Sequence, residues 1–278
     1  MRASKGWTIR TSTPPGQLPS SSMPEILVDR SDGLVTVTLN RPERLNAITN
    51  DMWVELARVF REVSHRKEDR ALVITGAGAA FCSGADLGGV GTPDRTAVEH
   101  MRMIGEAALA LHRLPKPTVA RVDGVAAGAG MNLALGCDLI VATDRSRFSE
   151  IFARRGLSVD FGGSWLLPRL IGLHKAKELV LLADVLSASE AAALGLVNRV
   201  VTPDQLDAAV TEWVDRLMAG PPIALSLSKM LLNKSFESSM DQALEAEAQA
   251  QAVNSASADA REARSAFLEK REPRFEGR

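Results

Sequence analysis

The sequence predicts one α/β domain of short strands, followed by a helical C-terminal region. Short apolar runs alternate with turns and helical patterns as far as residue 200. Helix-forming composition then dominates to the end, and no Gly/Pro/Ser-rich linker separates two folding units. A chain of 278 residues is long enough for one large core. We therefore expect a tail at 1–22, an α/β core at 23–200 and a helical region at 201–278.

The elements follow from periodicity and from the residues that stop it. Val35, Val37 and Leu39 alternate as in a half-buried strand, and Thr49 is placed to cap the next helix. In chain order, the predicted strands are 25–28, 34–39, 71–75, 118–122 and 138–142. The predicted helices are 49–63, 94–114, 131–135, 175–183, 189–194, 203–219, 221–234 and a long one at 240–268.

Composition excludes several classes of protein. A net charge of −1 argues against nucleic-acid or membrane-surface binding. Two cysteines cannot form a disulfide scaffold, and the four histidines are scattered over polar stretches, so we expect surface histidines and no metal site. Residues 1–22 are basic and rich in Ser, Thr and Pro, without the apolar region of a secretory signal. We expect a disordered tail, either a transit peptide or sequence upstream of a start at Met23, and a cytoplasmic protein.

The segment 118–142 joins two strand-like runs through Gly124, Gly128 and Gly130. A Gly-rich turn that leads into a helix exposes backbone N–H groups to a ligand, and the helix dipole favours negative charge there. One interpretation is a dinucleotide-binding turn. The short-chain dehydrogenase form of that turn requires a tyrosine, and the chain contains none. The other interpretation is an oxyanion hole, which needs a second N–H donor.

Four stretches carry a resemblance to a known family: NRPERLNAI (40–48), AFCSGADL (80–87), DGVAAGAGMNLALGCDL (123–139) and GLSVDFGGSWLLPRLIG (156–172). In this order they resemble the crotonase, or enoyl-CoA hydratase/isomerase, superfamily. The ending SAFLEKREPRF (265–275) is also similar to that family, so the resemblance extends from about Pro24 to Phe275.

The resemblance implies a spiral of β-β-α units with two roughly perpendicular sheets and a helical C-terminal trimerisation layer. It implies trimers or dimers of trimers and an acyl-CoA substrate, with coenzyme A as part of the substrate and no separate cofactor. Motif by motif, it assigns the oxyanion N–H groups to Ala85 and Ala129. Contacts to coenzyme A fall on Leu45, Ser83, Asp86 and Leu87, and contacts from a neighbouring subunit fall on Phe267 and Lys270.

The acids distinguish between reactions. Hydratases of this superfamily use two glutamates, whose positions here hold Asn132 and Phe152. Glu150 lies two residues before Phe152 and could share its face in an extended segment, but we expect it to be a surface acid. Efficient addition of water is therefore disfavoured.

Asp160 is the remaining acid in the matching stretch, where isomerases of the superfamily carry a catalytic aspartate and a dehalogenase carries a nucleophilic one. One carboxylate suffices for a 1,3-proton shift, and apolar neighbours such as Phe161 should raise its pKa. Asp160 could instead bond turn N–H groups. Asn132 near the acyl chain and Phe152 excluding water favour isomerisation. We therefore predict an acyl-CoA isomerase that shifts a double bond (3-enoyl to 2-enoyl, or in a ring acyl-CoA) through an enolate held in the oxyanion hole. A 2-enoyl-CoA hydratase, a thioester hydrolase and a non-catalytic acyl-CoA binder stay open as alternatives.

Overall fold

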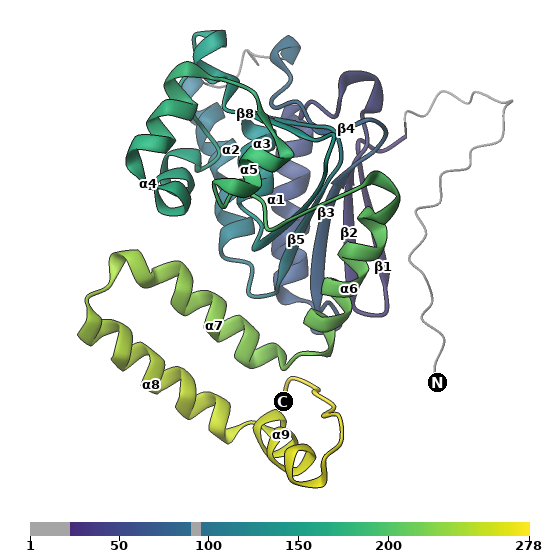
Figure 1. The fold of residues 1–278 in the computed structure, drawn as a ribbon, viewed down its shortest axis with the longest axis vertical. Coiled ribbons are helices and arrows are strands. Elements are labelled where there is room, and N and C mark those ends of the chain that lie inside the picture. Colours follow the sequence, from purple (N-terminus) through teal and green to yellow (C-terminus); the bar gives the residue numbers. More distant parts are fainter. Residues whose placement is uncertain (1–22, 90–95) are drawn as a thin grey trace, which may run out of the picture.

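The computed structural model of the chain describes residues 23–89 and 96–278, and its strands form two sheets (Figure 1). The larger sheet has the order β1 (Ile26–Ser31), β2 (Leu34–Leu39), β3 (Ala71–Gly76), β5 (Thr118–Val122), β7 (Leu139–Thr143), β10 (Arg199–Val201). The smaller sheet has the order β4 (Ala80–Cys82), β6 (Val125–Ala127), β8 (Arg147–Ser149), β9 (Leu186–Ser187). The predicted tail at 1–22 and the first two residues of the helix predicted at 94–114 lie outside the described residues.

Successive turns of the chain add one strand to each sheet. β3, β5 and β7 pair in parallel in the larger sheet, while β4, β6 and β8 pair in parallel in the smaller one. β1 and β2 form an antiparallel hairpin at one edge, in register from Ile26–Leu39 to Ser31–Leu34. This is the predicted α/β spiral, and the fold class is confirmed.

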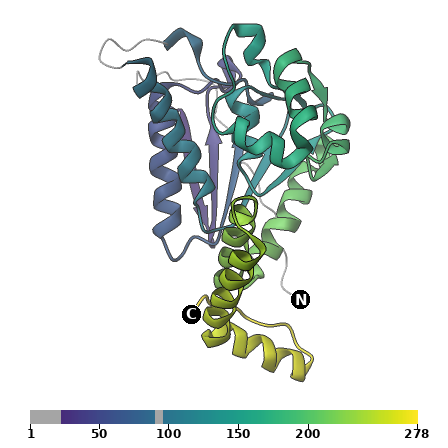
Figure 2. The same cartoon turned by 90° about the vertical axis from the view of Figure 1, so that its left-hand side faces the viewer.

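Helices cover both faces of the larger sheet. α1 (Asn50–His65) and α2 (Ala97–His112) lie side by side on one face (Figure 2). Thr49 caps α1 by accepting the N–H of Met52, and the predicted apolar face of α1 is buried. α6 (Leu206–Ala219) packs on the opposite face, where Val210 meets β-strand residues such as Val73. Successive side chains of β3 therefore pack into apolar layers on opposite faces of the sheet, as expected for a strand that is buried on both sides.

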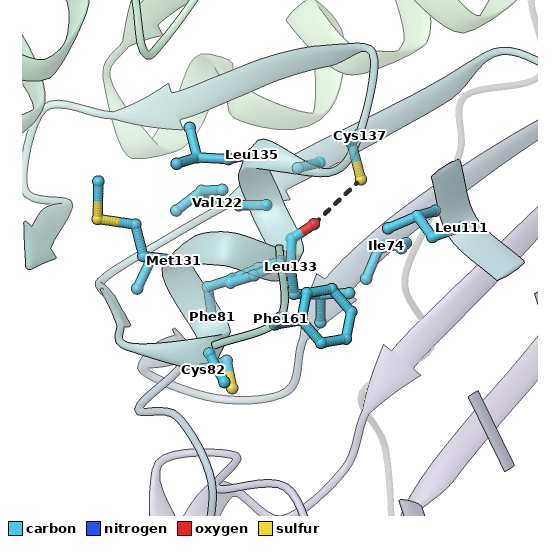
Figure 3. Close-up of a cluster of buried hydrophobic side chains, with 14 of the residues drawn as sticks. Ile74, Phe81, Cys82, Leu111, Val122, Met131, Leu133, Leu135, Cys137 and Phe161 are labelled. Atoms are coloured by element: carbon cyan, nitrogen blue, oxygen red, sulfur yellow. Dashed lines mark hydrogen bonds between the residues drawn. The ribbon is translucent and has the colours of Figure 1, made fainter. Parts of the chain in front are cut away.

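The short helix α3 (Ala129–Leu135) lies in the core, and all seven of its residues are buried. Figure 3 shows Leu133 among apolar side chains from several elements, including Phe81, Phe161 and Leu111. The backbone that starts α3 is thus held by close packing on all sides.

After β8 the described chain is mainly helical. The helices are α4 (Gly163–Leu182), α5 (Ala188–Ala193), α7 (Pro222–Lys234), α8 (Met240–Ala256) and α9 (Ala258–Glu269). Short 3₁₀ turns occur at η1 (Pro42–Arg44), η2 (Leu87–Gly89), η3 (Ile151–Arg155), η4 (Pro203–Gln205) and η5 (Ser235–Glu237). α4 begins twelve residues before the predicted Lys175 and is broken at Gly172, where φ is 74°.

The single long helix predicted at 240–268 is wrong. Ser257 is extended, with φ −70° and ψ 156°, and its hydroxyl accepts the N–H of Ala260 at 3.0 Å, so it ends α8 and caps α9. In both views α7, α8 and α9 form an arm below the core (Figures 1 and 2). The arm carries exposed apolar side chains: Leu232, Phe236, Met240, Leu244, Val253, Phe267 and Leu268. No helix in the described ranges has the length and apolar character needed to cross a membrane.

Candidate active site

The first predicted N–H donor, that of Ala129, lies at the junction of β6 and α3. Gly128 has φ 54° and ψ −128°, a conformation that a residue with a side chain rarely adopts, and its own N–H is bound by Ser149 O at 2.8 Å. The chain then enters α3, whose first N–H groups have no partner within the helix. We assign the capacity to bind an oxyanion to these N–H groups and not to a helix dipole, because α3 has only seven residues.

The second predicted donor, Ala85, forms an isolated parallel bridge with Ile48. The bridge uses the N–H of Ile48, bound to Gly84 O at 2.8 Å, and the N–H of Asp86, bound to Ile48 O at 2.9 Å. In this parallel pattern the N–H of Ala85 points away from Ile48.

The two segments that carry these donors are neighbours. A Cβ placed on Gly84 would lie 3.0 Å from Ala127 O and 3.8 Å from Ala129 N, and one on Gly130 would lie 2.5 Å from Cys82 O. Glycine at both positions lets the backbones approach this closely. The structure thus brings together the two backbone segments that the sequence predicted as an oxyanion hole.

The predicted coenzyme A contacts lie on the loops beside Ala85. Leu45 is left-handed, with φ 49°, and its side chain is 47% exposed, while Leu87 is 53% exposed. Ser83 is tied to this loop, since its N–H binds Leu45 O at 3.0 Å. Exposed Leu45 and Leu87, with the half-buried Ser83, form a rim next to the N–H groups.

Asp86 belongs to the same rim but is engaged within the protein. Its carboxylate accepts the N–H of Gly88 at 2.9 Å and the Arg41 guanidinium at 2.8 Å. The Gly88 N–H and the Arg41 guanidinium together lower the pKa of Asp86. Through these hydrogen bonds Asp86 stabilises the loop beside Ala85.

Sequence reasoning did not identify Asn46 and Arg41, which organise the rim. Asn46 is fully buried in a left-handed conformation; it accepts the N–H of Arg41 and donates to Ala77 O and Ala80 O. Asparagine tolerates this conformation better than most residues. Both residues lie inside the quoted stretch 40–48, but only the fold shows that they connect it to the β3–β4 turn.

Asp160 lies at the turn before α4. Its carbonyl accepts the N–H of Gly163 at 2.9 Å, and Phe161, left-handed with φ 47°, inserts its ring into the core against Trp53. Burial raises the pKa of Asp160 to about 6, and its Oδ1 has no hydrogen-bond partner among the described residues. A base of this kind is ionised at neutral pH yet can also return a proton.

Asn132 connects α3 to this turn. It is fully buried, and its Nδ2 donates to Asp160 O at 3.0 Å and to Glu150 Oε2 at 3.4 Å. A Cβ on Gly163 would lie 2.4 Å from Asn132 Nδ2, so only glycine fits against the amide. Asn132 is thus part of the packed structure that holds Asp160.

The prediction that Glu150 is a surface acid is wrong. Glu150 follows the last residue of β8, is only 1% exposed and points under α3 to Asn132. Burial, and secondarily the charge of Asp160, raise the pKa of Glu150 to about 8. In the sequence Glu150 looked like a surface acid. Its burial arises in the folded chain, where α3 packs against it.

Of the remaining predicted residues, Phe152 lies at the candidate site, whereas Phe267 and Lys270 lie far from it. Phe152 is 6% exposed, and its ring covers Gly128, with Cζ 3.5 Å from a Cβ placed there. Phe267 is 83% exposed, and both it and Lys270 lie at the end of α9, away from β4 and α3 (Figure 1). These two residues do not join the site within one chain.

Comparison with known sequences identifies the family. The family model for enoyl-CoA hydratase/isomerase matches residues 29–278. The chain belongs to the enoyl-CoA hydratase/isomerase family.

Relatives that are named for different reactions are similar to the chain. A 1,2-epoxyphenylacetyl-CoA isomerase of Escherichia coli (strain K12) is 38% identical over 91% of this chain and 98% of that relative. A short-chain-enoyl-CoA hydratase of Clostridium acetobutylicum is 33% identical over 88% of this chain and 95% of that relative. A crystal structure of an enoyl-CoA hydratase from Bacillus anthracis superimposes with a TM-score of 0.87 at 30% identity, covering 92% of this chain and 100% of that one. The family relationship is clear, and both reaction types occur among the relatives.

Proposed function

We propose that the protein is an acyl-CoA isomerase that moves a double bond from the β,γ to the α,β position of a thioester. The observation that carries the proposal is the position of Asp160, a half-buried acid with a raised pKa beside α3, whose first residue offers an oxyanion N–H. An isomerase needs one such group, because the same carboxyl can remove a proton from one carbon and return it to another.

In the proposed reaction the Asp160 carboxylate removes a proton from C2 of a 3-enoyl-CoA. The electron pair moves to the thioester oxygen and forms a dienolate, which the N–H groups of Ala85 and Ala129 stabilise more than the neutral carbonyl. The protonated Asp160 then delivers the proton to C4, and the double bond between C2 and C3 forms. No group is gained or lost by the substrate.

The residues around Asp160 support this reaction over hydration. Asn132 and Phe152 occupy the two positions that resemble the glutamate pair of hydratases, and the Phe152 ring covers Gly128. The 1,2-epoxyphenylacetyl-CoA isomerase among the relatives makes a ring acyl-CoA a second substrate class to test. Exposed Phe267 and Lys270 on α9 support assembly with a neighbouring subunit, where they would contact coenzyme A.

One observation favours a second candidate, a 2-enoyl-CoA hydratase. Glu150 is buried beside Asn132, and the charge of Asp160 contributes to its raised pKa, so the site contains two acids. Two carboxyl groups could position and deprotonate water, as the hydratases among the relatives must do.

The test is an Asp160→Asn variant assayed with 3-enoyl-CoA, 2-enoyl-CoA and 1,2-epoxyphenylacetyl-CoA. Loss of the base should lower kcat for isomerisation by about 10²–10⁴. Asp184→Asn, which changes an acid that is 65% exposed and paired with Arg154, is the control and should stay near wild type. An active Asp160→Asn variant, or wild-type protein that only hydrates 2-enoyl-CoA or only releases free thiol, would overturn the proposal.

A further inference from the structure

The reaction proposed above uses Asp160 and leaves a second buried acid without a role. Glu150 is only 1% exposed, and its Oε1 has no hydrogen-bond partner among the described residues. A carboxyl group buried in this way destabilises the native protein unless it remains neutral or is paired. Its presence at the centre of the site therefore requires a specific account.

A chain of contacts connects Glu150 to the base. Glu150 Oε2 accepts one N–H of the Asn132 amide at 3.4 Å, and Asp160 O accepts from the same nitrogen at 3.0 Å. Asn132 cannot shift easily, because it is fully buried and lies so close to Gly163 that a Cβ placed there would be 2.4 Å from its Nδ2. An acceptor at Glu150 thus sets the orientation of the amide that holds the Asp160 turn.

The surroundings favour the neutral form of Glu150. The acid faces Asn132 from α3 and Asp160 from the turn before α4, and the structure records no ion pair to it among the described residues. The two cations of its own element, Arg154 and Arg155, are exposed, and Arg154 pairs with Asp184. Burial raises the pKa of Glu150 to about 8 and outweighs the hydrogen bond from Asn132, which lowers the pKa, so the group is protonated at neutral pH.

We propose that Glu150 is a positioning residue that acts as a neutral acid, holding Asn132 and through it the carbonyl and carboxylate of Asp160. The proposal rests on the isomerase function of Asp160. Protonated Glu150 supplies an acceptor to Asn132 without adding charge.

Ionisation of Glu150 would oppose catalysis, because a second carboxylate in the site would repel the negative charge that develops on the dienolate. Glu150 directly follows Ser149, whose carbonyl binds the N–H of Gly128 next to the oxyanion donor Ala129. The rate should therefore fall at alkaline pH as Glu150 loses its proton.

The first test is the pH profile of kcat/KM in wild type and Glu150→Gln. The amide of glutamine can accept the Asn132 N–H and does not titrate. The variant should keep kcat at pH 7 within about threefold of wild type and lose the alkaline decline. A loss of about 10² or more at pH 7 would mean that Glu150 transfers a proton itself, and an unchanged alkaline decline would mean that another group causes it; either result overturns the proposal.

The second test separates positioning from bulk. Glu150→Met keeps the volume but removes the acceptor, so kcat should fall by about tenfold or more with little change in KM, and glutamine should restore it. Equal activity of the methionine and glutamine variants would overturn the positioning role. Glu178→Gln, at an acid that is 51% exposed on α4, controls for the change in charge and should retain wild-type kinetics.

A third measurement needs no substrate and is independent of the reaction. The infrared spectrum at pH 7 should contain a protonated-carboxyl band that is absent from Glu150→Gln and titrates away at alkaline pH. A missing band would show that Glu150 is ionised and would overturn the proposal. Failure of the isomerase function would instead appear as a silent wild type with 3-enoyl-CoA; if that protein hydrates 2-enoyl-CoA, the same variants are compared in that reaction.

Discussion

Burial raises the pKa of both Asp160 and Glu150, but the two acids differ in how deeply they are buried and in how far the pKa rises. Asp160 is half-buried at the start of the turn before α4 and has a pKa of about 6. Glu150 is enclosed behind Asn132 and has a pKa of about 8. At neutral pH the first is a base and the second is an acid, so one pair of carboxyl groups supplies two roles.

The raised pKa of Glu150 predicts a pH-dependent stability. Below pH 4.5, its ordinary pKa, the acid is protonated in the folded and unfolded states alike. Between pH 4.5 and about 8 only the unfolded state releases the proton, so the folded state loses stability as pH rises, by roughly 1.4 kcal/mol for each pH unit.

Glu150→Gln removes this loss. Its Tm should exceed that of wild type by a margin that grows between pH 4.5 and 8 and is constant above, as thermal unfolding at a series of pH values would reveal. Asp160 acts in the same direction at lower pH but is common to both proteins. A Tm difference independent of pH would contradict a buried neutral Glu150.

At the scale of elements, the site depends on the close approach of α3 to the first turn of α4. α3 supplies Asn132 and the N–H of Ala129, and α4 starts at Gly163 directly after the Asp160 turn. A Cβ at Gly163 would not fit against the Asn132 amide, so we expect the distance between the two helices to determine where Asp160 lies.

Gly163→Ala should therefore lower kcat. The added methyl would lie 2.4 Å from Asn132 Nδ2 and 2.6 Å from Val159 Cγ2, which forces the amide or the turn to move. A displacement of this size should lower kcat by about 10-fold to 100-fold. Gly105→Ala, in α2 with no atom within 4 Å of the new Cβ, is the matched control and should leave kcat unchanged while stabilising the helix slightly, by about 0.5–1 kcal/mol. Wild-type kcat in the Gly163 variant would show that the contact is irrelevant.

Element-scale patterns were the most predictable part of the chain. The alternation in β2, the cap at Thr49 and the Gly-rich entry to α3 lie where local rules place them, because each depends on neighbours in sequence. The break at Ser257 was missed, since the Ala- and Glu-rich composition on both sides favours a continuous helix. Glu150 was misplaced for a different reason: α3 lies over it only in the folded chain.

At the scale of the whole molecule, the core and the arm of α7, α8 and α9 are spatially distinct (Figure 2). All of the predicted catalytic residues lie in the core, whereas Phe267 and Lys270 lie at the far end of the arm. Motif resemblance could assign these two residues to coenzyme A only through a neighbouring subunit, and a single chain leaves that assignment a prediction. The buried acids, by contrast, are assembled within one chain.

The most direct test of the account follows the fate of 3-enoyl-CoA and 2-enoyl-CoA with wild-type protein by NMR. We predict that 3-enoyl-CoA becomes the conjugated 2-enoyl thioester with a kcat/KM at least about 10² above that for hydration of 2-enoyl-CoA, as expected when one carboxylate serves both proton transfers. Rapid formation of 3-hydroxyacyl-CoA from 2-enoyl-CoA, with slower isomerisation, would contradict the account and make Glu150 and Asp160 a hydratase pair.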